Sequence, residues 1–191
     1  MFPIETFRTT LGKIITIFHK YKIRFHLTGG ITSIAYSEPR MTQDVDIVVD
    51  NQAIMTQLDS FLDSLRASDF IFDEAAIRIA IDKRQMFQLL DSVEALKLDI
   101  YPRELIPGEL ERSNSLELFD GITVPIASLP DTAISKLIWI SKGSHKNRSD
   151  LRHLLRVSTP GQRQAIEKLA IEFGLGDLLS EVLSESDEID V

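Results

Sequence analysis

The segment from Leu27 to Asp50 constrains the fold of this chain more than any other stretch. It begins with the glycine pair Gly29-Gly30, continues as a short helix and a loop, and ends on a β-rich run that carries Asp44 and Asp46. Residues i and i+2 of an extended chain point to the same face, so these two carboxylates project side by side while Val45 faces the other way. The segment predicts a strand with one apolar and one acidic face.

The same segment combines two features suited to phosphate chemistry. Carboxylates that project side by side attract Mg²⁺, which prefers oxygen ligands and often bridges carboxylates to substrate phosphates. The glycine pair lets the backbone approach a phosphate at a helix N-terminus, where free N–H groups favour an anion. Ser33 lies three residues after Gly30, and its hydroxyl could help to hold the phosphate; an ordinary serine on the surface of a helix explains it equally well.

A second strand offers a third carboxylate. From Leu96 to Tyr101, apolar residues alternate with Lys97, Asp99 and Tyr101, so Asp99 lies on the polar face of the strand. If this strand pairs beside residues 44–49, Asp99 joins the first two acids. A solvent-facing aspartate is the alternative for Asp99 alone, but together with the glycine pair and the Asp-x-Asp pattern we favour a site.

The remaining periodicity predicts an α/β half followed by an all-helical half, divided into domains at residues 1–127 and 128–191. Asp120-Gly121 is a strong hairpin signal between two short strands. Asp50, Ser128 and Thr159 are predicted to cap helices. We expect helices over 3–21, 30–36 and 52–66, strands over 23–27, 44–49, 86–90, 96–101, 116–119 and 122–126, either structure over 70–81, and four helices after Ser128.

Composition narrows the function classes. The 191 residues carry a net charge of −8, which excludes a wholly basic surface that coats nucleic acid but leaves a local basic patch open. There are no cysteines, and the N-terminal residues resemble neither a signal peptide nor a membrane span, so we expect a cytoplasmic protein that does not associate with membranes. The helical half carries cations that could contact phosphate or be ordinary surface charges: Lys136, Lys142, Lys146, Arg148 and Arg152.

These motifs carry a family resemblance. Gly29-Gly30, thirteen intervening residues, Asp44-Val45-Asp46 and the later Asp99 resemble the nucleotidyltransferase superfamily of the DNA polymerase β type. The chain is more closely similar to small bacterial nucleotidyltransferase-like proteins related to abortive-infection type IV toxins, whose downstream helices resemble the stretches DTAISKLIW and SDLRHLL here. The resemblance spans about residues 25–180. It implies an α+β fold, with a nucleotidyltransferase-like mixed β-sheet flanked by helices and then a C-terminal helical bundle.

The resemblance also implies roles for individual residues. Asp44 and Asp46 would bind Mg²⁺, with a two-metal site expected and Mn²⁺ as an alternative, and Asp99 would complete the site and help to activate the attacking hydroxyl. Lys136 would contact the phosphates or the nucleotide, and Asp150 matches the same helical motif. The group that would hold the triphosphate is Gly29, Gly30 and Ser33.

The implied reaction moves a nucleoside monophosphate from a nucleoside triphosphate, ATP included, to an acceptor hydroxyl on an RNA end, a protein or a small molecule. The toxin relatives have a Lys-Asp or Arg-Asp pair where this chain has Lys146-Asn147-Arg148-Ser149, so toxin activity does not follow from this stretch. A toxin component neutralised by an antitoxin is one alternative. A non-catalytic nucleotide- or partner-binding module is another, although such a module would more often have lost one of the three aspartates.

Overall fold

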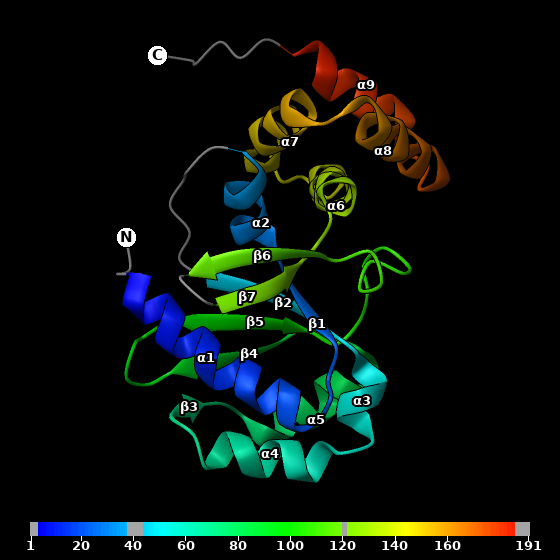
Figure 1. The fold of residues 1–191 in the computed structure, drawn as a ribbon. Coiled ribbons are helices and arrows are strands. Elements are labelled where there is room, and N and C mark those ends of the chain that lie inside the picture. The colour runs from blue at the N-terminus through cyan, green and yellow to red at the C-terminus, as the bar shows by residue number, and fades with distance from the viewer. Residues whose placement is uncertain (1–3, 38–43, 120–121, 186–191) are drawn as a thin grey trace. The chain divides into compact units, whose positions relative to one another are not determined.

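A seven-stranded mixed sheet is the centre of the first of two compact units (Figure 1). The computed structural model describes residues 4–37, 44–119 and 122–185. The first unit comprises Met1–Ile31 and Met41–Ala127, and the second comprises Thr32–Arg40 and Ser128–Val191. The predicted α+β class, a mixed sheet with helices and further C-terminal helices, is confirmed. The division into independent domains at residues 127 and 128 stays a prediction.

The strands follow the order β3-β4-β5-β2-β1-β7-β6 across the sheet. The β2–β5 and β1–β7 pairs are parallel and the other neighbours are antiparallel. The predicted pairing of β2 with β5 is therefore confirmed, as are the two predicted hairpins; the Asp120-Gly121 turn itself lies outside the described residues. The strands are β1 (Phe25–Thr28), β2 (Asp44–Val49), β3 (Phe70–Ile71), β4 (Phe87–Asp91), β5 (Lys97–Tyr101), β6 (Asn114–Phe119) and β7 (Ile122–Ile126).

One face of the sheet is apolar and is covered by α1 (Ile4–Lys20). The rings of Phe18 in α1 and Phe25 in β1 lie 5.1 Å apart, and the Thr10 hydroxyl donates to Asp91 in β4 at 2.8 Å. The helix therefore spans the sheet from β1 to β4, as Figure 1 shows. The fully buried residues on this face include Val45, Ile47, Leu89, Leu98 and Ile100. Burial of this face fixes the strand register, and the alternating residues point to the opposite face.

The prediction of a single helix over residues 52–66 is wrong, because the structure has two helices there. They are α3 (Asn51–Met55) and α4 (Leu58–Arg66). The chain turns at Gln57, whose side-chain amide donates to the carbonyl oxygens of Tyr21 and Ala53 at 3.0 and 3.2 Å. These bonds offer the backbone an alternative to a continuous helix, and local sequence periodicity does not reveal the contact with Tyr21.

The ambiguous stretch 70–81 contains both kinds of element. Phe70–Ile71 forms the edge strand β3, and α5 (Glu74–Lys83) follows after the cap residue Asp73, whose carboxylate accepts from Ala76 N at 3.0 Å. The predicted cap at Asp50 is confirmed by its bond from Gln52 N at 3.0 Å. No helix in the described ranges is both long and apolar enough to cross a lipid bilayer.

The second unit is helical. α2 (Gly29–Tyr36) contributes its residues from Thr32 onward, and four further helices follow. The predicted cap at Ser128 is confirmed, and Thr159 and Gln162 form the predicted capping box. The core of this unit includes Ile134, Leu137, Leu151, Leu154 and Ile166, all fully buried. The helices are α6 (Leu129–Ser141), α7 (Lys146–Val157), α8 (Pro160–Glu172) and α9 (Gly176–Ser184).

Candidate active site

The register of β2 and β5 brings the three predicted carboxylates to one face of the sheet. Asp46 lies directly opposite Asp99, and Asp44 lies opposite Lys97. The side chain of Asp44 is 41% exposed, whereas that of Asp99 is 9% exposed. The acids therefore form a short row at the polar face, with one end open to solvent.

Gly29 lies against Asp46. Its backbone has φ +64°, a left-handed conformation that favours glycine, and a Cβ at this position would be 2.7 Å from Cγ of Asp46. The glycine pair is thus adjacent to the acidic row, at the start of α2. Position 29 requires glycine for two independent reasons, the backbone conformation and the closeness of the carboxylate.

Two neutral side chains hold the carboxylates of this row. The Tyr101 hydroxyl donates to Oδ1 of Asp46 at 3.2 Å, and the Gln88 amide donates to Oδ1 of Asp99 at 3.0 Å. Burial, and next the negative charge of Asp46, raise the pKa of Tyr101. Tyr101 is therefore a protonated donor, and it orients one oxygen of Asp46.

Lys97 places a positive charge among the acids. Its Nζ lies 3.0 Å from Oδ2 of Asp99 and 3.7 Å from Oδ2 of Asp44. The hydrogen bond with Asp99 raises the pKa of Lys97. The sequence analysis assigned no role to Lys97, Tyr101 or Gln88. The alternation along β5 already placed Lys97 and Tyr101 on the face of Asp99, but nothing local indicated Gln88, which comes from β4.

The donor set fits a divalent cation in its chemistry. Carboxylate oxygens are the ligands that Mg²⁺ and Mn²⁺ prefer, and the ammonium of Lys97 is a cation already held by two of the three acids. In the part of the chain that the structure describes, however, no three Asp, Glu or His side chains are gathered in a geometry that could hold a metal ion. Both oxygens of Asp99 are engaged, one by Gln88 and one by Lys97.

The other predicted contacts meet inside the second unit. Nζ of Lys136 in α6 lies 2.9 Å from Oδ2 of Asp150 in α7, and the Ser33 hydroxyl of α2 donates to the same oxygen at 3.4 Å. Lys136 and Ser33 are both buried. The structure therefore brings together three residues that are far apart in the sequence, and a phosphate-binding role for Ser33 and Lys136 stays a prediction.

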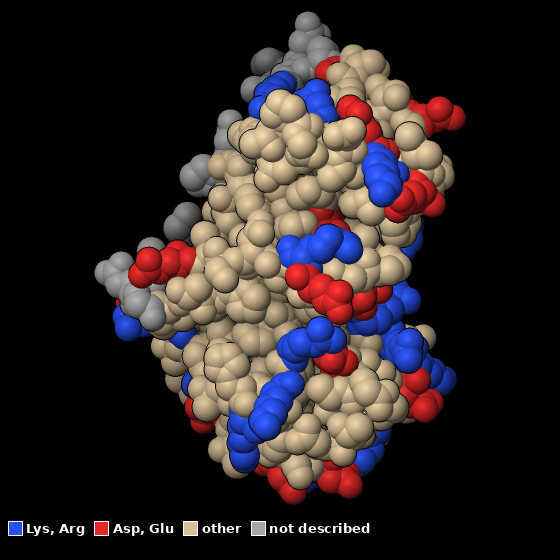
Figure 2. Space-filling model, turned by 45° about the vertical axis from the view of Figure 1, so that its right-hand side comes forward, with Lys and Arg blue, Asp and Glu red and all other residues tan. Residues whose placement is uncertain are grey.

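The arginines of the predicted basic cluster are ion-paired within the second unit. Arg148 contacts Glu181 at 3.0 Å and also Glu185, and Arg152 contacts Glu185. In the face that Figure 2 shows, the Lys and Arg side chains alternate with Asp and Glu rather than forming a continuous basic area. These arginines therefore serve the packing of α7 against α9 and are weaker phosphate candidates than the sequence suggested.

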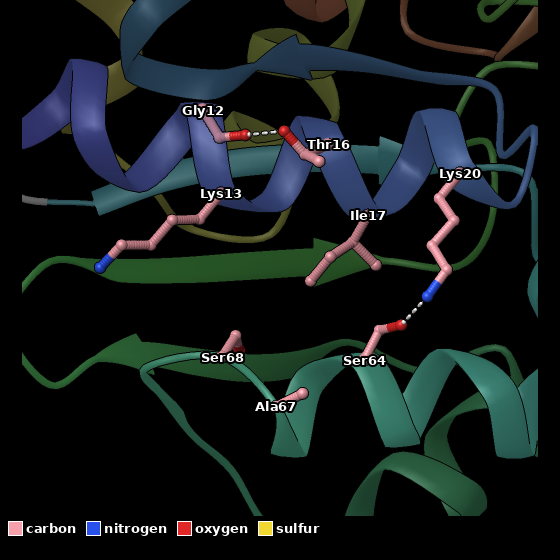
Figure 3. Close-up of a pocket in the computed structure, with 8 residues that line it drawn as sticks. All are labelled: Gly12, Lys13, Thr16, Ile17, Lys20, Ser64, Ala67 and Ser68. Atoms are coloured by element: carbon pink, nitrogen blue, oxygen red, sulfur yellow. Dashed lines mark hydrogen bonds between the residues drawn. The ribbon is translucent and has the colours of Figure 1, made fainter.

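In a surface groove between α1 and α4, the two lysines each already make a side-chain contact (Figure 3). Lys13 at one end bonds Asp69 and Asp91, at 3.0 and 2.9 Å. Lys20 at the other end donates to Ser64 at 2.9 Å. The groove is lined by Gly12, Lys13, Thr16, Ile17, Lys20, Ser64, Ala67 and Ser68. The acidic row remains the stronger candidate site.

Three solved structures illustrate what this chain is similar to. The solution structure of the antibiotic-resistance factor ANT(2'')-Ia superposes with a TM-score of 0.58 at 11% identity, covering 95% of this chain and 99% of that one. Two further structures are more distant. A nucleotidyltransferase-like protein from Paracoccidioides brasiliensis has a TM-score of 0.49 at 16% identity and covers 94% of this chain and 92% of its own. The lincosamide antibiotic adenylyltransferase LnuA has a TM-score of 0.48 at 16% identity and covers 78% of this chain and 96% of its own. At 11% identity, the similarity to ANT(2'')-Ia shows the fold alone.

The family assignment comes from the sequence. A search of curated proteins gives no significant match. The family described as nucleotidyl transferase AbiEii toxin, type IV TA system, matches residues 16–186, which include β1, the acidic row and the helices that carry Lys136 and Asp150. The resemblance drawn from the glycine pair and the aspartates is thereby confirmed, and this chain belongs to the AbiEii nucleotidyltransferase toxin family.

Proposed function

We propose that this protein is a metal-dependent nucleotidyltransferase that moves a nucleoside monophosphate from a nucleoside triphosphate to an acceptor hydroxyl. The observation that carries the proposal is the register of β2 and β5, which sets Asp46 opposite Asp99 while Gly29 abuts Asp46. A glycine turn at a helix N-terminus favours a phosphate, and carboxylates on one face supply the oxygen ligands that Mg²⁺ prefers.

The reaction is an in-line displacement at the α-phosphorus. The acceptor oxygen forms a bond to the α-phosphorus, the bond from that phosphorus to the oxygen bridging to the β-phosphate breaks, and pyrophosphate leaves. The proton of the acceptor hydroxyl goes to a carboxylate, for which Asp99 is the candidate. A bound divalent cation supplies neutralisation of the charge on the phosphate oxygens.

Individual residues have separate tasks in this scheme. Asp44 and Asp46 hold the divalent cation, and Tyr101 keeps one oxygen of Asp46 in a fixed orientation. The backbone at Gly29 and Gly30 receives the triphosphate, because these two residues carry no side chains of their own. In the second unit, Lys136 and Ser33 are candidates for phosphate contact, and Asp150 holds both in position.

The family description supports a partner as well as a reaction. A type IV toxin family implies an antitoxin, and we propose that a separate antitoxin neutralises this protein in the cytoplasm. The acceptor is an RNA end, a protein side chain or a small molecule. The net charge of −8 argues against a long nucleic-acid footprint, because affinity for a phosphate backbone grows with the number of phosphates that cations neutralise.

Titration calorimetry with each nucleoside triphosphate, with and without Mg²⁺, tests the proposal. The wild type should bind at least one triphosphate only when Mg²⁺ is present. Asp46→Asn should lose at least about tenfold in affinity, because loss of a residue that merely supports a metal ligand already costs about 10- to 100-fold. Asp82→Asn, at an exposed position of α5, removes the same charge elsewhere and should bind like the wild type.

Transfer is then followed with α-³²P-labelled donor incubated with pools of RNA, protein or small hydroxyl compounds. Label should pass to one pool with the wild type and not with Asp46→Asn. Binding without transfer to any pool would favour the non-catalytic nucleotide-binding module. Absence of binding to every triphosphate would contradict the proposed site.

A further inference from the structure

Lys97 contacts carboxylate oxygens for which a bound divalent cation would have to compete. Its ammonium contacts Oδ2 of Asp99 at 3.0 Å and Oδ2 of Asp44 at 3.7 Å. These two acids come from different strands, β5 and β2, and Asp44 lies opposite Lys97 in the register. Lys97 therefore bridges the two strands by charge at the edge of the acidic row.

We propose that Lys97 is an internal counter-ion, which holds the carboxylates together when no divalent cation is bound and competes with that cation for them. This inference rests on the proposed metal site. It adds a residue whose task is to set the metal affinity of the protein and to keep the acidic row intact between reaction cycles.

The geometry supports competition rather than cooperation. Both oxygens of Asp99 are already engaged, one by Lys97 and the other by the Gln88 amide at 3.0 Å. A divalent cation that takes an oxygen of Asp99 must displace one of these donors. Gln88 is neutral, whereas the ammonium of Lys97 also repels the incoming charge, so the lysine is the partner that the cation displaces.

The same contacts would stabilise the acidic row whenever no metal ion is bound. Asp46 and Asp99 face each other across adjacent strands, and like charges in that relationship destabilise a sheet. Lys97 supplies an opposite charge within the protein. Its side chain is 38% exposed, so its ammonium can move into solvent, away from the carboxylates. A displaced Lys97 leaves a positive charge beside the site, where the triphosphate of the donor would be attracted to it.

Direct metal binding by the 191-residue chain tests the inference without reference to turnover. Free Mn²⁺ is measured by electron paramagnetic resonance during titration of the wild type, Lys97→Met and Lys97→Gln, with no nucleotide present. Both Lys97 variants should bind Mn²⁺ at least about fivefold more tightly than the wild type, the low end of ordinary coupling between two ligands. Lys83→Met removes the same charge from the exposed end of α5 and should match the wild type.

Thermal melting gives a second readout. In EDTA, Lys97→Met should melt below the wild type, since the carboxylates then repel each other, and added Mn²⁺ should raise its Tm more than that of the wild type. Mn²⁺ affinity of both Lys97 variants equal to or weaker than that of the wild type would overturn the inference and leave the metal site standing. A wild type and variants that all fail to bind Mn²⁺ would overturn the inference together with the metal-dependent function.

Discussion

Gly29 packs so closely against Asp46 that a Cβ on Gly29 would lie 2.7 Å from Cγ and 3.0 Å from Cβ of the aspartate. Gly29→Ala should therefore displace the carboxylate as well as strain the backbone at φ +64°. We expect the free energy of unfolding to fall by about 3 kcal/mol, of which about 1–2 kcal/mol is the cost of left-handed backbone. Urea unfolding measures the loss.

Gly174→Ala separates the two causes. Gly174 has φ +68°, and its Cβ would meet no atom within 4 Å. That variant should lose only the backbone cost. If the two alanine variants lose the same free energy of unfolding, the closeness of Asp46 is unimportant and glycine is needed at position 29 for its backbone alone.

The ion pair of the buried Lys136 with the partly buried Asp150 should contribute strongly to the stability of the second unit. Lys136→Met leaves the carboxylate without an ammonium 2.9 Å away, and removal of one partner of a buried pair costs about 3–5 kcal/mol. The double variant Lys136→Met with Asp150→Asn should lose clearly less than the sum of the two single variants, with an interaction energy of at least about 1 kcal/mol. Urea unfolding of all four proteins gives this value.

The exposed pair Lys168–Glu172 in α8 is the matched comparison. Its atoms are 3.8 Å apart and its side chains are 77% and 53% exposed, so Lys168→Met should cost less than about 1 kcal/mol. Equal losses for Lys136→Met and Lys168→Met would show that the Lys136–Asp150 pair is not important for folding.

Asp91 should make the first unit sensitive to acid. Burial alone would raise the pKa of this fully buried carboxyl group, but bonds from Lys13 at 2.9 Å, from Thr10 at 2.8 Å and from two backbone N–H groups hold the pKa below its usual range. Asp91→Asn should lower the free energy of unfolding near neutral pH by about 2 kcal/mol, the order of a lost charged hydrogen bond.

The sign of the pH dependence follows from the lowered pKa. A carboxyl group whose pKa is lower in the folded state contributes its full stability above the unfolded value of about 3.9 and loses it as the pH falls through the folded value. The difference between the wild type and Asp91→Asn should therefore be constant near neutral pH and shrink below about pH 4. A constant difference for Asp91→Asn down to pH 2 would contradict the assignment.

Tyr101→Phe should weaken the site with little effect on the fold. The variant loses the hydroxyl that donates to Asp46 at 3.2 Å, and one hydrogen bond of this kind is worth about 1 kcal/mol, or about fivefold in affinity. Calorimetry with Mg²⁺ and the preferred nucleoside triphosphate should show this loss. Tyr21→Phe, whose hydroxyl bonds Ser60 and Ser64 on α4, should leave nucleotide affinity unchanged. Equal nucleotide affinity in the wild type and Tyr101→Phe would remove Tyr101 from the site.

Local patterns predicted the parts of the fold that depend on neighbours in sequence. The alternation in β2 and β5 gave each strand its polar face, and the cap residues Asp50, Ser128 and Thr159 were correct because their bonds close within three residues. The break at Gln57 was missed, since the carbonyl of Tyr21 that binds its amide is 36 residues away.

Sequence alone determined which side chains share a strand face, because the period of two is a property of the extended backbone. It thereby identified Asp44, Asp46 and Asp99 as a candidate row and the glycine pair as its companion. Only the tertiary structure decided that Asp99 is held by Gln88 and Lys97, and that Ser33, Lys136 and Asp150 meet. Those contacts depend on which distant segments pair and at what register, and this is fixed by burial of the core rather than by any local pattern.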